Sequence, residues 1–241
     1  CSKEVKRALI ELKQQGAKSL VLDVRSNGGG LLSEAVNVVN FFVPKGLEIV
    51  KTKGKFKQMD HAYRTTNEPI DLDIPLTVLV DGGTASAAEV LSGSLQDLDR
   101  AVIIGNRTFG KGLVQNQIPY SDGSALRLTI ARYYTPTGRS IQRPYENGKE
   151  LDYHMDIIRR YQNNEFFSAD SIHFADSLKF TTPRGRVVYG GGGIMPDIFV
   201  PLDTLNITKY FSQVSGRNIL YRYTIDYSDR NRKALEGVKS I

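Results

Sequence analysis

The sequence predicts a layered α/β domain, and three observations carry that prediction. Two glycine-rich turns, at residues 26–30 and 81–84, each follow a short apolar run and precede a helical pattern. Further apolar runs alternate with helical patterns, as expected for sheets covered by helices. A chain of 241 residues, with 40% hydrophobic and 24% charged residues, is long enough to bury a substantial core.

The first strand–turn–helix unit lies near the amino end. Apolar residues at helical spacing predict a helix over residues 3–15, and Gly16 ends it. A buried strand is expected at 19–24, and the glycine turn after it leads into a helix at 31–42. A strand at 47–52 follows that helix.

The second unit repeats the order of the first. An apolar run at 75–81 predicts a strand, and the turn at its end leads into a helix at 85–98. Three more strands are expected, at 101–105, 113–118 and 126–134.

The rest of the chain has a different character. Residues 143–183 are polar and irregular, with weak helical patterns at 151–161 and 168–178, and we interpret them as an insertion. The elements expected after it are strands at 186–189 and 198–200 and helices within 204–241.

Charge and composition limit the classes of partner. The net charge is +6, and the densest basic run alternates lysine with other residues: Lys51, Lys53, Lys55 and Lys57. This spacing is typical of a solvated edge strand protected by lysines rather than of a nucleic-acid interface. We therefore expect no nucleic-acid partner.

Membrane spans and metal sites are not expected either. The apolar runs are far shorter than the ~20 residues that a spanning helix needs. A single cysteine, Cys1, rules out an internal disulfide and a cysteine-ligated zinc site. His61, His154 and His173 lack the paired spacing of a metal-binding helix. We expect no metal ion and no other cofactor.

The glycine turn at 26–30 has more than one possible role. A glycine turn that opens a helix exposes backbone N–H groups, which can bind a phosphate or an oxyanion that forms during a reaction. Ser33 stands where a dinucleotide fingerprint has its third glycine, and no Gly-Lys-Ser/Thr follows the turn. A tight turn and an anion site both stay open on these residues alone.

Two side chains are candidates for nucleophilic catalysis. Ser86 lies at the start of the second predicted helix among small residues, where a serine can cap the helix or attack a substrate. A nucleophilic serine needs a base, and the histidines lie in polar stretches. Lys111, between Gly110 and Gly112, is either an exposed turn lysine or a base that apolar neighbours desolvate.

Six short motifs occur along the chain, and in sequence letters they are LDVRSNGGG at 22–30, GTASAAE at 83–89, LQD at 95–97, RA at 100–101, TFGKG at 108–112 and GIMPD at 193–197. Together, and in this order, they resemble the catalytic core of the carboxyl-terminal processing peptidases, also called tail-specific proteases. The resemblance covers roughly positions 1–142 and 186–200.

The resemblance implies a catalytic dyad. Ser86 corresponds to the family's serine nucleophile, and Lys111 stands at the family's spacing for the general base. Gln115, four residues beyond the lysine, corresponds to a glutamine that orients the amine. Strand alternation would place positions 111, 113 and 115 on one face.

The resemblance also implies an oxyanion hole and a fold. In relatives the hole combines the N–H after the serine with one from the first glycine loop, here Ala87 with Gly29 or Gly30. The implied fold is a crotonase-like ββα layered core. We divide the chain into a protease core at 1–142, an insertion at 143–183, core-completing strands at 184–203 and a helical segment at 204–241.

Family members usually carry a PDZ domain before this core. We expect the chain to be a fragment that lacks that domain and an export signal. The implied function is an endopeptidase that cleaves polypeptides near their C-terminal tails, in the periplasm or cell envelope. A homo-oligomer, and membrane association of the full-length protein, are compatible with the resemblance.

Two alternatives belong to other function classes. One is a non-catalytic or autoinhibited peptide-binding core, in which the dyad is present but misaligned. The other is a nucleotide-binding α/β protein that uses residues 28–30. Peptide cleavage distinguishes the first from an active peptidase, and saturable nucleotide binding would support the second.

Overall fold

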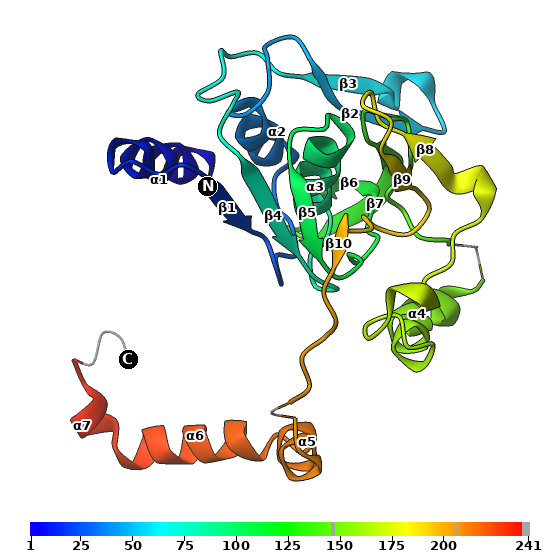
Figure 1. Cartoon of the computed structure of the whole chain (residues 1–241). Coiled ribbons are helices and arrows are strands. Elements are labelled where there is room, and N and C mark those ends of the chain that lie inside the picture. Colours follow the sequence, from blue (N-terminus) through cyan, green and yellow to red (C-terminus); the bar gives the residue numbers. More distant parts are fainter. Residues whose placement is uncertain (146–147, 206, 238–241) are drawn as a thin grey trace. The chain divides into compact units, whose positions relative to one another are not determined.

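The computed structural model describes residues 1–145, 148–205 and 207–237 (Figure 1). The chain divides into two compact units, Cys1–Pro201 and Leu202–Ile241. The first unit contains two four-stranded sheets, a short two-stranded sheet and the helices that cover them. The predicted α/β class is therefore confirmed.

A parallel sheet forms one layer of the first unit. Its strand order is β1-β4-β5-β10, and all three strand pairs are parallel. The strands are β1 (Leu20–Asp23), β4 (Leu76–Val80), β5 (Val102–Gly105) and β10 (Ile198–Phe199). Both predicted strand–turn–helix units are present, because β1 leads through its turn into α2 and β4 leads into α3. Their turns therefore meet at the carboxyl ends of neighbouring strands.

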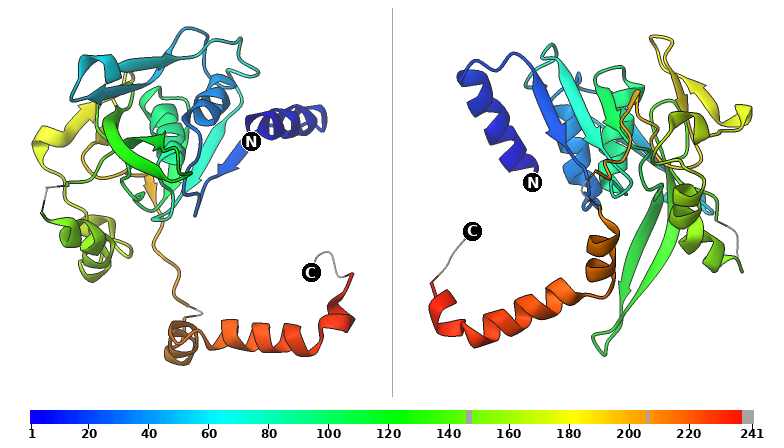
Figure 2. Two further views of the ribbon diagram at one scale, coloured as in Figure 1. Left: turned by 180° about the vertical axis from the view of Figure 1, so that it is seen from behind. Right: turned by 60° about the horizontal axis from the view of Figure 1, so that its bottom comes forward.

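An antiparallel sheet forms a second layer, in the order β3-β2-β7-β6. Its strands are β2 (Glu48–Gly54), β3 (His61–Arg64), β6 (Leu113–Pro119) and β7 (Ala125–Tyr134). The interpretation of the lysine run as an edge strand is wrong, because β2 pairs with β3 on one side and with β7 on the other. Strand β3 was missed because its four residues are mostly exposed and show no apolar alternation. In Figure 2 the green β6 and β7 extend away from the body, and most of their residues between 115 and 129 are exposed.

Helix α3 (Ala87–Asp97) is buried along its whole length. It packs against α2 (Leu32–Asn40), β5 and β2, so it lies between the two sheets (Figure 1). Small residues allow this close approach: a Cβ on Gly93 would lie 2.6 Å from Ile194 Cδ1. The amino-terminal helix α1 (Ser2–Gln14) packs on α2.

The stretch that follows β7 contains one helix and several short turns. Helix α4 (Glu150–Gln162) matches the first weak helical pattern. The helix expected at 168–178 is wrong, because this stretch forms two short 3-10 turns, η2 (Ala169–Ser171) and η3 (Asp176–Leu178). Between them the chain is extended, and Phe174 stacks on Tyr189. The other short elements are η1 (Lys57–Met59), β8 (Lys179–Thr181) and β9 (Val187–Tyr189).

The second unit is helical, as the sequence predicts. Its helices are α5 (Lys209–Gly216), α6 (Ile219–Arg230) and α7 (Arg232–Leu235), and residues 206 and 238–241 lie outside the described part of the chain. None of the helices in the described ranges has the length and apolar character that crossing a bilayer requires.

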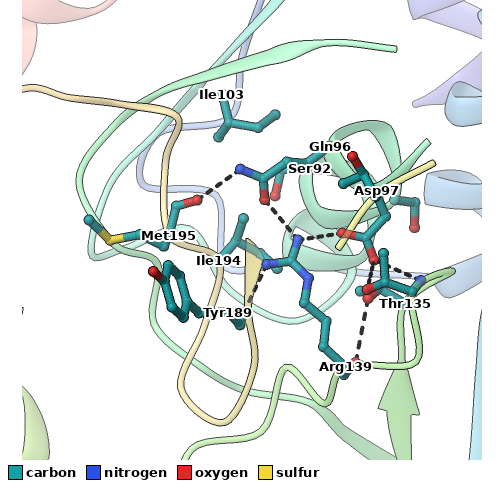
Figure 3. Close-up of polar contacts among 12 residues, drawn as sticks. Ser92, Gln96, Asp97, Ile103, Thr135, Arg139, Tyr189, Ile194 and Met195 are labelled. Carbon is teal, nitrogen blue, oxygen red and sulfur yellow. Dashed lines mark hydrogen bonds and ion pairs between the residues drawn. The ribbon is translucent and has the colours of Figure 1, made fainter. Parts of the chain in front are cut away.

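A buried ion pair stabilises the C-terminal end of α3 (Figure 3). Arg139 Nη2 lies 2.7 Å from Asp97 Oδ1, and the two side chains are 1% and 0% exposed. The guanidinium also donates to Gln96 Oε1 and to the carbonyl oxygen of Tyr189. Gln96 in turn donates to the carbonyl oxygen of Met195, so the network joins α3 to the segment before β10.

We expect Arg139→Met to lower the free energy of unfolding by about 3–5 kcal/mol, because it leaves the Asp97 carboxylate buried without its cation. Urea unfolding followed by circular dichroism measures this change. Arg132→Met is the matched control, since Arg132 is an exposed residue of β7. Equal midpoints for the two variants would contradict the assigned role of the pair.

Candidate active site

The site begins at the turn between β4 and α3. Ser86 is the N-cap residue of α3 and has φ 57° and ψ −120°, a backbone conformation that residues other than glycine rarely adopt. Such strain persists only where the surrounding structure holds it. Ser86 is half-buried, so solvent reaches the turn that presents it.

The first glycine loop lies directly against this serine turn. The Asp81 carboxylate accepts hydrogen bonds from the N–H groups of Ser26, at 2.8 Å, and Gly83, at 2.9 Å. Gly29 has φ 93°, and a Cβ there would lie 2.8 Å from both Ala87 N and Ser86 Cβ. Only glycine fits this position, which explains one member of the glycine cluster.

The backbone N–H groups of Gly29, Gly30 and Ala87 differ in whether another group already accepts their hydrogen bond. The N–H of Gly29 donates to Asn27 Oδ1 at 2.9 Å. Among the hydrogen bonds of the described residues, none uses the N–H of Gly30 or that of Ala87. Gly30 and Ala87 can therefore donate to a ligand oxygen in this structure, whereas Gly29 can do so only when Asn27 releases it.

The Glu89 carboxyl group joins the serine turn, residues 81–86, to residues 107–112, which we call the lysine loop. Its Oε2 accepts from the N–H of Ser86 at 2.9 Å and from the N–H of Lys111 at 2.8 Å. Its Oε1 accepts from Thr108 Oγ1 at 2.5 Å and from the N–H of Gly110 at 2.7 Å. Burial raises the pKa of this carboxyl group, and the four hydrogen bonds oppose that rise. One buried carboxyl group thus holds the backbone of Ser86 close to the backbone of Lys111.

The sequence analysis did not identify this role of Glu89. Its position three residues after Ser86 is the spacing of a capping box, in which the carboxyl group accepts from the N-cap N–H. That spacing could have predicted the bond to Ser86. The bonds to the lysine loop are non-local and have no signal in the sequence.

Residues 192–194, which lie much later in the chain, also support the lysine loop. Thr108 accepts from the N–H of Ile194 through its hydroxyl at 2.6 Å and donates its own N–H to the Ile194 carbonyl oxygen. A Cβ on Gly192 would lie 2.2 Å from the guanidinium of Arg107, which donates to the Gly192 carbonyl oxygen. The glycine cluster at 190–193 therefore allows close packing against this loop.

Gln115 lies farther along the same chain, in β6. The register shift between β6 and β7 leaves Ile130 of β7 as the extra residue, so β6 itself is regular from Leu113 onward, and Lys111 lies two residues before that strand begins. Gln115 is exposed, whereas Lys111 is half-buried. The expectation that the two share a face, and a role of Gln115 in catalysis, both stay predictions.

A cavity opens next to the glycine loop. It has a volume of about 430 Å³ and begins at Gly29, Gly30 and Ala87. Its other walls are mostly apolar and include Val24, Leu31, Ala35, Val38 and Leu91. Within the described residues, no group of three or more His, Cys, Asp or Glu side chains could hold a metal ion. The arrangement therefore offers a hydroxyl, an amine, two N–H groups and an apolar cavity.

A comparison with known families shows which family the chain belongs to. The model of peptidase family S41 matches residues 1–155, which include the serine turn, the glycine loop and the lysine loop. The chain belongs to peptidase family S41. The alternative of a nucleotide-binding protein is not supported, since the glycine loop of this S41 chain packs on the serine turn.

Curated relatives match the S41 core. The chain is 46% identical over 138 residues to a chloroplastic C-terminal processing peptidase of Tetradesmus obliquus, covering 57% of this chain and 29% of the relative. It is 52% identical over 127 residues to a carboxy-terminal-processing protease of Bartonella bacilliformis, covering 52% of this chain and 29% of the relative. The aligned part is thus less than a third of the length of each relative.

Solved structures show the same S41 fold. The photosystem II D1 C-terminal processing protease superposes with a TM-score of 0.58 at 32% identity, covering 88% of this chain and 42% of that one. A putative S41 protease from Bacteroides fragilis has a TM-score of 0.50 at 20% identity and covers 63% of this chain and 44% of that one. The second likeness supports the fold alone.

Proposed function

We propose that the chain is the catalytic core of a serine endopeptidase, with Ser86 as nucleophile and Lys111 as general base. The observation that carries the proposal is the Glu89 carboxyl group, whose Oε2 accepts from the N–H groups of both residues. This contact brings the two backbone segments together at the exposed start of a buried helix. The family membership supplies the reaction class, which is peptide hydrolysis by a serine.

The proposed reaction proceeds in two stages. Lys111, as the neutral amine, takes the hydroxyl proton of Ser86 while Oγ attacks a peptide carbonyl carbon. The tetrahedral intermediate collapses, the C–N bond breaks, and the Lys111 ammonium returns the proton to the leaving amine. Water then attacks the acyl-enzyme with Lys111 again as base, which releases the new carboxyl end and restores Ser86. Gln115 is proposed to orient the amine.

The oxyanion of each intermediate is proposed to accept hydrogen bonds from Ala87 and from Gly30 or Gly29. Ala87 and Gly30 have N–H groups that no described hydrogen bond uses. The first turn of α3 also favours developing negative charge. Each such donor contributes about 2.7–4 kcal/mol to lowering the barrier.

The apolar cavity supports a preference for substrates with an apolar side chain next to the cleaved bond. Because it begins at Gly29, Gly30 and Ala87, it lies where the side chain next to the attacked carbonyl would enter. Its lining includes Lys3 and Glu34 but is mostly apolar, so an apolar side chain gains most from burial there. The relatives named for C-terminal processing support a substrate cleaved near its C-terminal tail. They also support an extracytoplasmic location, in the periplasm or cell envelope.

The test is cleavage of a set of unstructured peptides that differ in the residue before one central bond. The wild-type chain is expected to cut peptides with valine or leucine there at least about tenfold faster than those with aspartate or lysine. Mass spectrometry of the fragments gives the cut position relative to the C-terminal tail. Cleavage that persists unchanged in Ser86→Ala would exclude the proposed nucleophile, and equal rates for all peptides would exclude the cavity as the binding site.

A further inference from the structure

A segment that continues past the end of the family match packs against the lysine loop. We name residues 148–174, which include α4, the α4 segment. Arg160 of α4 donates through Nη1 to the carbonyl oxygen of Thr108 at 2.9 Å and through Nη2 to that of Arg107 at 2.8 Å. The two carbonyl groups precede Lys111 by only a few residues. The guanidinium thus binds the loop backbone as a two-pronged donor, which a single ammonium cannot reproduce.

Arg160 is held in place by its own surroundings. The residue is 3% exposed, and burial lowers the pKa of its guanidinium to about 10, so it stays cationic at neutral pH. Glu165 lies 3.4 Å from Arg160 Nε and also forms a 2.8 Å ion pair with Arg107. The Phe166 ring lies 5.2 Å from the guanidinium carbon. The α4 segment therefore supplies a counter-charge, Glu165, and an aromatic neighbour, Phe166, for this cation.

The same segment contacts the turn before Ser86. A Cβ on Gly82 would lie 2.8 Å from Phe166 Cε1, so the ring packs directly on that backbone. A further contact reaches the lysine loop, because the Arg143 guanidinium lies between the rings of Phe109 and Tyr153, at 4.2 and 4.1 Å. The α4 segment thus touches both of the backbone stretches that carry the proposed dyad.

We propose that the α4 segment positions the lysine loop relative to Ser86, with Arg160 as the positioning residue. Glu89 holds the loop from the α3 side through N–H groups, and Arg160 holds it from the α4 side through carbonyl groups. The inference rests on the proposed function, since it assigns Arg160 an effect through Lys111. Arg160 lies outside residues 1–155, the part that the family model matches.

The test compares Arg160→Met with Arg159→Met. Methionine keeps much of the packing volume but donates no hydrogen bond, and Arg159 is an exposed α4 residue that pairs with Asp152. Arg160→Met is expected to lower kcat for peptide hydrolysis about 10- to 100-fold with little change in KM, because a misplaced base slows chemistry rather than binding. Arg159→Met should keep the wild-type kcat. A folded Arg160→Met with wild-type kcat overturns the inference.

Hydrogen exchange gives a readout that does not depend on activity. The amides of Gly110 and Lys111 are expected to exchange faster in Arg160→Met, while those of β4 and β5 keep their wild-type rates. Unchanged exchange at 107–112 overturns the inference. If Ser86→Ala keeps activity, the proposed function fails, and the exchange data still report whether Arg160 orders the loop.

Arg160→Lys keeps the test decisive if Arg160→Met does not fold. Lysine retains a buried cation near Glu165 but presents a single ammonium to the two carbonyl groups. Its kcat is expected to lie between those of wild type and Arg160→Met. A wild-type kcat and wild-type exchange in Arg160→Lys would overturn the role of the two-pronged contact.

Discussion

Ser86→Ala is expected to lower kcat for peptide hydrolysis by about 10⁴-fold or more, because no other group in the proposed mechanism forms the acyl-enzyme. The backbone around the residue should survive the change. The Ser86 N–H still donates to Glu89, and alanine removes one oxygen without adding volume. Peptide hydrolysis, with enzyme concentration fixed by absorbance, measures the loss.

Ser92→Ala is the matched control for this variant. Ser92 lies in the same helix, is buried, and donates its hydroxyl to the Ala88 carbonyl oxygen. Its loss should leave kcat within about twofold of wild type, because a typical intramolecular hydrogen bond contributes only ~1 kcal/mol to stability and does not act on the reacting atoms. Equal losses in both variants would indicate damage to α3 rather than loss of a nucleophile.

Lys111→Met is expected to lower kcat between about 10²- and 10⁴-fold, the usual contribution of a general base. The effect should not depend on the loop losing its shape, because Glu89 binds the backbone N–H of residue 111 rather than its side chain. The same peptide assay measures the change.

Lys111→Arg tests whether residue 111 acts as a base or only as a positive charge. Arginine keeps the positive charge but cannot release its proton in a protein, so it cannot act as a base. We expect it to be as inactive as Lys111→Met. Activity near wild type in Lys111→Arg would instead assign the residue a purely electrostatic role and remove it as the general base.

The sequence predicted the elements that have local signals. The βα units around the turns at 26–30 and 81–84 were predictable because each joins an apolar strand to a periodic helix. The expectation that the first of these strands is buried was wrong, because β1 lies at the edge of its sheet and is partly exposed. The α4 helix was predicted only weakly, since it keeps most of its residues at the surface. Strand β3 had no pattern of its own, because its position depends on pairing with β2.

The supports of the site could not be predicted from the sequence for a related reason. Arg160 binds carbonyl groups that lie 52 and 53 residues earlier in the chain, and Asp81 binds an N–H group 55 residues earlier. Nearly every residue has the same backbone N–H and carbonyl groups, so the identity of the residue that is bound gives no sign of such a contact. Glu89 had one local signal, the capping-box spacing, and that spacing indicates only one of its four bonds.

The contact between Thr108 and Ile194 has a consequence for how the protein is made. Thr108 of the lysine loop accepts one hydrogen bond from Ile194 and donates one to it, and the ribosome adds Ile194 86 positions later. A nascent chain that ends before residue 194 lacks those bonds as well as β10, the strand that completes the parallel sheet. By contrast, the hydrogen bond between Asp81 and the N–H of Ser26, which joins the serine turn to the first glycine loop, needs only residues up to the end of β4 and its turn. The lysine loop therefore gains its full set of contacts only late in translation.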